Sequence, residues 1–400
     1  MIWLILLFLL AVLGLPWFAA LGLVVIGFHL SVGLDPAVAV MEFGRLRDYE
    51  TLLALPLLLL CAQLLAGDAF KATRGGGERS GAERRWYLGT WLATLPDQLL
   101  QWPVATGRGL RGQAGPPDFA ARPDPARSMA ALSACLLAPS LILILVGLLF
   151  SMLIPARSPG LQAIFLAGLV PAMLLQAAAL SWTYRSGGAP RRPGTRAALT
   201  RPSFMIVATL LFVLVAGLYA GRWGVFEGSA GAALILLLRQ LITERLASGR
   251  LIESVLAAAI PFGALALLLG LGLGWAAVVA DSGLGREWTG MMERAASVHA
   301  AAPAVLVSLL WLLAAAMFRP LPALILAAPL IFPAAVRSGL AAEQLAVITV
   351  LALHTGAGIA ALWRAGQPWR DAVVLVPHLA ALVLAAAWPG LSLWLPGRIL

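Results

Sequence analysis

The sequence predicts an all-α, polytopic integral membrane protein, and three observations support this fold class. Hydrophobic residues make up 61% of the 400-residue chain and charged residues only 12%, whereas soluble domains hold about 45–50% and about 25%. Apolar runs near the length of a spanning helix, about 20 residues, recur from end to end. Arginines gather in the short segments between these runs. We therefore expect a single membrane domain over 1–400 with about ten transmembrane helices.

The apolar runs are taken in chain order, and the domain is divided only for description into 1–127, 128–250 and 251–400. The first run, 2–28, has no charged leader region and is expected to be a spanning helix rather than a cleaved signal peptide. The other runs are 51–67, 86–105, 129–154, 161–182, 203–221, 228–247, 255–280, 302–318, 321–336, 340–363 and 371–396.

Segment 86–105 differs from the other runs because tryptophan and polar residues alternate in it, and Pro96 and Asp97 interrupt it. Aromatic side chains with one apolar and one polar part favour the membrane–water interface. We expect this segment to lie in the interface or to re-enter the membrane without crossing it.

Charge placement predicts the orientation. The basic residues are all arginine except Lys71, and clusters of basic residues mark cytoplasmic loops. The segment 281–300 is nearly balanced in charge and is expected to be an external loop. These assignments place the N-terminus in the cytoplasm and the C-terminus in the periplasm of a bacterial inner membrane. The net charge of +10 is explained by these loops, and with no nucleic-acid-binding motif we expect no nucleic-acid partner. The arginine-rich segments are 71–85, 107–127, 184–201, 239–250 and 364–370.

Proline occurs inside similar apolar runs in the two halves of the chain, at Pro56 and at Pro329 with Pro333. Short or broken helices at corresponding positions are the sequence sign of an inverted-repeat transporter. Proline is also common in membrane helices without such a role. The pattern therefore favours a transporter-like repeat.

Catalytic and cofactor motifs are not found. The four histidines lack the spacing of a metal site, and no phosphate-binding loop or dinucleotide fingerprint occurs. Cys61 and Cys135 lie inside apolar runs, where thiols behave as small hydrophobes. We expect neither an enzyme nor a resident cofactor or metal.

Two polar pairs within apolar runs are the candidate substrate- or ion-binding residues, since ionisable groups are costly in lipid. Glu227 and Ser229 begin one run, where the carboxylate either coordinates a cation or is stabilised by the helix dipole. His354 and Thr355 lie mid-run beside two glycines, which permit a helix break or close helix packing. His354 is either a proton or substrate site or a hydrogen-bonded histidine between helices.

The order of several short motifs resembles the large membrane subunit of tripartite ATP-independent periplasmic (TRAP) transporters. The most specific is 164–171, Ile-Phe-Leu-Ala-Gly-Leu-Val-Pro, which is similar to the family's Leu-Phe-Leu-Ala-Gly-Ile-Leu-Pro signature. Glu227 falls where the family places the Glu of Thr-Pro-Thr-Glu-Ala. Further matches run in the same order at 14–16, 53–65, 138–141, 217–221, 317–318, 328–333 and 388–396.

The resemblance implies a secondary transporter of a small organic anion, driven by sodium and served by a small membrane subunit and a periplasmic binding protein. Both hairpin motifs that carry the family's binding oxygens are missing. The first region is shortened to the polar segment 108–127, and the second motif is absent near 359–361. The alternative is therefore a non-transporting relative that acts as a scaffold or assembly subunit among other membrane subunits.

Overall fold

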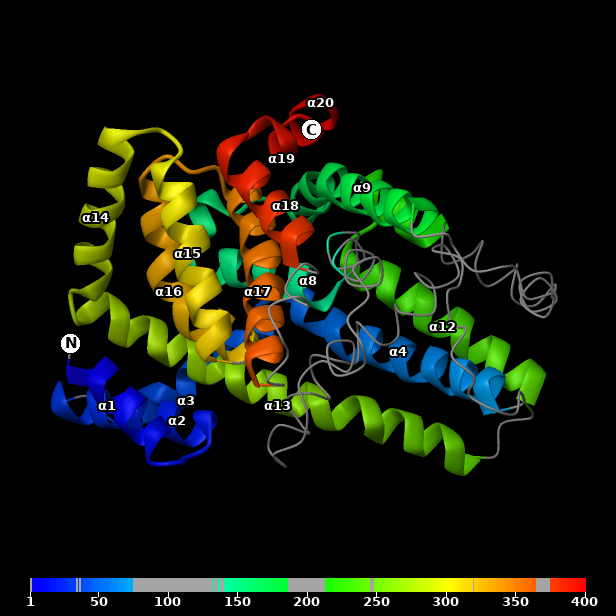
Figure 1. The fold of residues 1–400 in the computed structure, drawn as a ribbon. Helices are drawn as coiled ribbons and strands as arrows, with labels where there is room; N and C mark the ends of the chain where they lie inside the picture. The colour runs from blue at the N-terminus through cyan, green and yellow to red at the C-terminus, as the bar shows by residue number, and fades with distance from the viewer. Residues whose placement is uncertain are drawn as a thin grey trace.

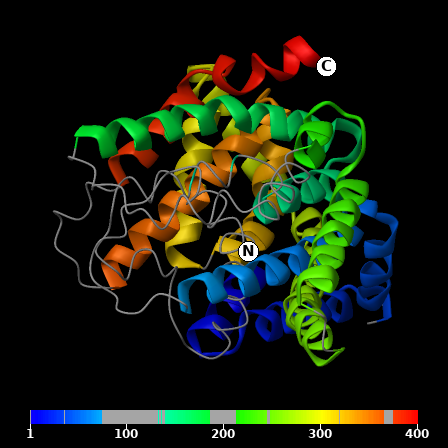
Figure 2. The ribbon, with the colours of Figure 1, turned by 90° about the vertical axis from the view of Figure 1, so that its right-hand side faces the viewer.

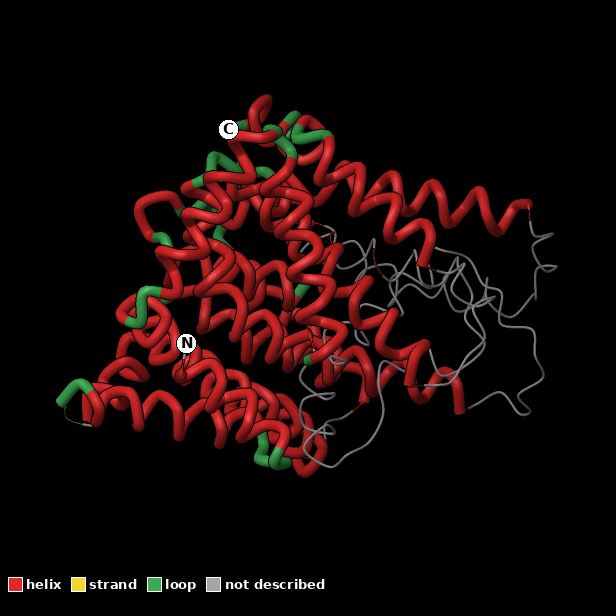
Figure 3. The backbone as a smooth tube through the Cα atoms, turned by 60° about the vertical axis from the view of Figure 1, so that its left-hand side comes forward, coloured by secondary structure: helices red, strands yellow, loops and turns green. Residues whose placement is uncertain are grey.

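The computed structural model describes residues 2–33, 35, 37–74, 132, 136, 140–185, 213–244, 248–318, 320–364 and 375–400. Every element within these ranges is a helix, joined mostly by short loops (Figures 1 and 3). The all-α prediction is confirmed for this part of the chain. A helix satisfies its own backbone hydrogen bonds, which an apolar environment requires. The expectations for 86–105 and for the first hairpin region at 108–127 lie outside the described residues.

Four described helices are long and apolar enough to cross a membrane, and a bent helix pair makes a fifth candidate. This is compatible with a multi-pass membrane protein. The four are α9 (Leu161–Arg185), α13 (Ser248–Asp281), α16 (Pro320–Arg337) and α17 (Ala342–Arg364). The pair consists of α18 (Val376–Ala387) and the residues Gly390–Ile399, bent by 86°. Shorter apolar helices are α2 (Trp17–Ser31), the first part of α4 (Glu50–Arg74), α8 (Leu141–Leu153) and α15 (Ala302–Met317).

The bent pair replaces the expected straight run over 371–396. The chain leaves α18 at Trp388, and the short helices α19 (Gly390–Leu393) and α20 (Pro396–Ile399) follow in a new direction. The bend leaves carbonyls at the end of α18 without partners in their own helix. The buried Gln344 side chain of α17 donates to one of them, the Ala385 carbonyl, at 2.8 Å.

The N-terminal run is two helices, so its prediction as one spanning helix was wrong. Helix α1 (Ile2–Val12) ends before Gly14, which has φ 86°, and α2 starts directly after Pro16. A left-handed glycine followed by proline ends one helix and starts the next. The two helices pack together (Figure 1). The Trp3 ring lies edge-on to the Phe28 ring, with 5.8 Å between the ring centroids. The helix α3 (Ala37–Gly44) and the turn η1 (Arg45–Asp48) follow.

The prolines do not break their helices. Helix α4 runs through Pro56, and α16 runs through both Pro329 and Pro333. Helices α9 and α13 likewise continue through internal prolines. Membrane helices tolerate proline because neighbouring helices and local adjustments satisfy the freed carbonyls. The prolines at these corresponding positions therefore do not mark helix breaks.

Two expected loops are largely helical. Helix α12 (Val225–Glu244) extends into the segment 239–250, and α13 begins at Ser248. The segment 281–300 contains the amphipathic helix α14 (Leu284–Val298), which packs on α15 and α16. Its inner face buries Leu284, Thr289 and Met292. The charges that suggested a loop are exposed on its outer face: Arg286, Glu287, Glu293 and Arg294.

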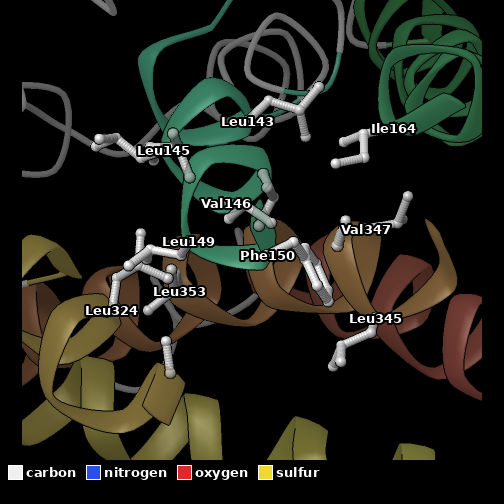
Figure 4. Close-up of a cluster of buried hydrophobic side chains, with 14 of the residues drawn as sticks. Leu143, Leu145, Val146, Leu149, Phe150, Ile164, Leu324, Leu345, Val347 and Leu353 are labelled. Carbon is white, nitrogen blue, oxygen red and sulfur yellow. The ribbon is translucent and has the colours of Figure 1, made fainter. Parts of the chain in front are cut away.

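Helix α8 is enclosed by other helices. Ser140 precedes it, and the 3-10 helix η2 (Pro155–Arg157) follows it. Every residue from Leu141 to Phe150 is buried, so α8 has no exposed face over these ten positions. Helix α8 lies between α9 and α4 (Figure 2) and also packs on α16 and α17. Phe150 lies in the leucine-rich cluster of Figure 4, and its ring stacks on that of Phe332 at 4.3 Å. Ser140 caps the helix, accepting from the Leu143 amide at 3.2 Å.

Candidate functional site

Glu227 and Ser229 lie in the first turn of α12, where the helix leaves four amide groups without partners inside the helix. Glu227 is exposed, and a Cβ placed on Gly224 would lie 2.5 Å from its Oε2. The carboxylate therefore folds back over the start of the helix, where the dipole favours negative charge. Ser229 is buried, and its hydroxyl donates to the Phe226 carbonyl at 2.8 Å. This geometry favours a helix-end carboxylate over a cation ligand.

His354 and Thr355 lie within α17, which runs unbroken through both residues. The Thr355 hydroxyl is fully buried and donates to the Leu351 carbonyl at 2.7 Å. His354 is partly buried, and its Nδ1 lies 3.2 Å from the Val350 carbonyl. Both side chains therefore bond to the preceding turn of their own helix.

Close helix packing explains one of the glycines beside this pair. A Cβ on Gly356 would lie 2.6 Å from the carbonyl oxygen of Leu312 and 2.8 Å from Cβ of Ala315, both on α15. The glycine thus lets the backbones of α15 and α17 approach each other. Of the two roles expected for the glycines, a break or close packing, Gly356 has the second.

The two predicted pairs are not joined in one site within the described part of the chain. Helix α12 packs mainly on α4, whereas α17 packs mainly on α15 and α18 (Figure 1). His378 is buried on α18, which packs on α17, the helix that holds His354.

Sequence reasoning missed that the helix of His378 packs on the helix of His354. The two residues lie in consecutive apolar runs, 340–363 and 371–396, and consecutive helices are often neighbours. That spacing was the available signal, but it does not show which faces meet. The structure settles the neighbourhood through the packing of α17 on α18.

Among the described residues, no group of three or more His, Cys, Asp or Glu side chains could hold a metal ion. The Ser229 and Thr355 hydroxyls each donate to a carbonyl of their own helix, and α17 runs without a break through His354 and Thr355.

The family resemblance rests on the order of the short motifs. Comparison of the sequence with protein-family models and with curated proteins gives no match.

Proposed function

We propose that this chain is a divergent large permease subunit of the TRAP-transporter lineage, which moves a small organic anion across a bacterial inner membrane. In this proposal the chain crosses the membrane about ten times, with a cytoplasmic N-terminus and a periplasmic C-terminus. A small membrane subunit and a periplasmic binding protein would serve it. The coupling cation is left open, because both of the family's hairpin motifs are missing from the sequence.

The observation that carries this proposal is the burial of α8. A helix of 13 residues is about 20 Å long, too short for a hydrocarbon core of about 30 Å. Its neighbours α9, α16 and α17 are all candidate spans. Transporters use such non-spanning segments at membrane depth, where protein rather than lipid surrounds them. A simple bundle of full-length spans has no need of one.

Uptake into proteoliposomes tests this proposal. The chain would be reconstituted with the partners that co-purify with it after gentle solubilisation, and supplied with a panel of radiolabelled small organic acids. Substrate-dependent uptake that requires an imposed cation gradient is the expected result. If none of these substrates accumulates above empty vesicles although the partners are a small membrane subunit and a binding protein, the transport proposal fails.

A second function, that of a non-transporting scaffold subunit, is favoured by a specific observation. Three of the four candidate residues, Ser229, His354 and Thr355, bond within their own helices, and the two pairs lie on helices with different main neighbours. Co-purification separates the two functions. Subunits of an unrelated membrane assembly in stoichiometric amounts would support the scaffold, whereas a small four-helix membrane protein with a periplasmic binding protein would refute it.

A further inference from the structure

Helix α14 has a charged outer face that the described part of the chain leaves uncovered. The helix packs on α16 and α15 (Figure 1), and its inner face is buried against them. On the opposite side, all four charged residues of the helix are exposed to the surroundings. They are Arg286, Glu287, Glu293 and Arg294.

The order of these charges divides the outer face into two flanks. Successive residues lie about 100° apart around a helix, so residues seven positions apart lie on nearly the same side. Arg286 and Glu293 therefore form one flank. Glu287 and Arg294 form the other, with the two charges in the opposite order. Gly290 lies midway between the flanks, and a Cβ placed on it would meet nothing within 4 Å. The face is thus an open glycine seam with one arginine and one glutamate on each side.

The four charges have no partners in the described part of the chain. No ion pair or side-chain hydrogen bond joins any of them to another described residue. Opposite charges stabilise a helix when they lie three or four residues apart. The positions three and four residues from each of these charges hold only uncharged side chains. Pairing within α14 therefore does not explain the pattern.

The location of α14 beside α16 makes an uncovered charged face costly. Helix α16 is a candidate membrane span, and charged side chains at membrane depth avoid lipid. Such side chains face water or pair with opposite charges in another part of the assembly. The reversed order of the charges on the two flanks distinguishes between these coverings, because it makes the face complementary to itself.

Two copies of the chain inserted in the same direction would bring their α14 helices together in parallel. In a symmetric parallel pair, each flank of one helix meets the opposite flank of the other. Arg286 then faces Glu287 of the second copy. Glu293 likewise faces Arg294 of the second copy. Symmetry repeats each contact, so the four charges of each helix are all matched with opposite charges.

We propose that the outer face of α14 is the contact surface between two copies of this chain, with Gly290 where the helices cross. Glycine at a crossing lets two backbones approach closely, and the charged flanks fix the register of the pair. The pairing is independent of transport, and it holds for a permease or for a scaffold subunit.

Cysteine cross-linking of the full-length chain in native membranes tests the crossing point. Gly290→Cys is oxidised with copper phenanthroline, and covalent dimers are measured on a non-reducing gel. Gly263→Cys in α13 is the matched control, because a Cβ there also meets nothing within 4 Å. A disulfide forms only when the two Cα atoms lie within about 7 Å, so Gly290→Cys should dimerise at least about tenfold faster than Gly263→Cys and the wild type. Equal rates overturn the proposal.

Charge exchange tests the register. Arg286→Glu sets two glutamates against each other at both symmetric contacts, and should weaken association of the full-length chain at least about tenfold. Adding Glu287→Arg restores opposite charges and should restore association. Arg398→Glu reverses an exposed arginine on α20 and should have no effect. Association is measured by energy transfer between labelled chains at increasing dilution in liposomes. A monomeric wild type, or a double variant that stays as weak as Arg286→Glu, overturns the proposal. If Gly290→Cys does not fold, this series gives the decision.

Discussion

The close approach of α15 and α17 at Gly356 permits a quantitative prediction. In Gly356→Ala the new Cβ would lie 2.6 Å from the Leu312 oxygen, 2.8 Å from Ala315 Cβ and 3.2 Å from Leu312 Cα. Carbon atoms in favourable contact are about 3.5–4.0 Å apart. Two of the three obstructing atoms belong to the backbone, so α15 as a whole has to move away. Overpacking of this kind costs about 1–3 kcal/mol.

Helix propensity acts in the opposite direction, since alanine is favoured over glycine by about 1 kcal/mol within a helix. The variant Gly263→Ala in α13 isolates that gain, because a Cβ at Gly263 meets nothing within 4 Å. The free energy of unfolding of Gly356→Ala should therefore be about 1–3 kcal/mol lower than that of Gly263→Ala. Titration with SDS in mixed micelles, followed by circular dichroism, measures this difference. Equal stability of the two variants would refute the close-packing explanation.

Two further predictions concern hydrogen bonds that join helices. Gln344→Leu leaves the Ala385 carbonyl at the α18 bend without its 2.8 Å donor. The free energy of unfolding should therefore fall by about 1–3 kcal/mol. A free energy of unfolding equal to that of the wild type in the same SDS titration would contradict this role. Trp275→Phe removes the 2.9 Å bond from Nε1 to the Leu326 carbonyl, and should cost about 1 kcal/mol. Trp363→Phe is the control for the second prediction, since Trp363 is 84% exposed. Equal decreases in the free energy of unfolding for both tryptophan variants would show that the bond between Trp275 and Leu326 does not stabilise the fold.

Continuous hydrophobicity was sufficient to predict several helices closely. The runs 161–182, 302–318 and 340–363 correspond to α9, α15 and α17 within a few residues. The predictions were wrong where local chemistry competes with hydrophobicity. Gly14 and Pro16 divide a run that is apolar throughout. In α14, charged residues occupy one face of a helix whose other face is buried, so their number suggested a loop while their spacing fits a helix.

The candidate site was predictable only residue by residue. Apolar flanks singled out His354 and Thr355, and the structure places both within an unbroken α17. The sequence could not show that the Thr355 hydroxyl is satisfied by Leu351, since any threonine in a helix has that option. Nor could it show which face of α18 packs on α17, because the rotation of α18 about its axis depends on packing against several helices at once.

The burial of α8 also constrains how the protein is made. Its partners α16 and α17 end more than 180 residues later in the chain. A ribosome that adds about 5–20 residues per second needs about 10–45 s to reach the end of α17 after it has completed α8. During that interval α8, which is too short to cross the bilayer, has α4 and then α9 available beside it but lacks α16 and α17. The burial of α8 is therefore completed only after α16 and α17 have been made, so a helix synthesised early depends on helices synthesised late.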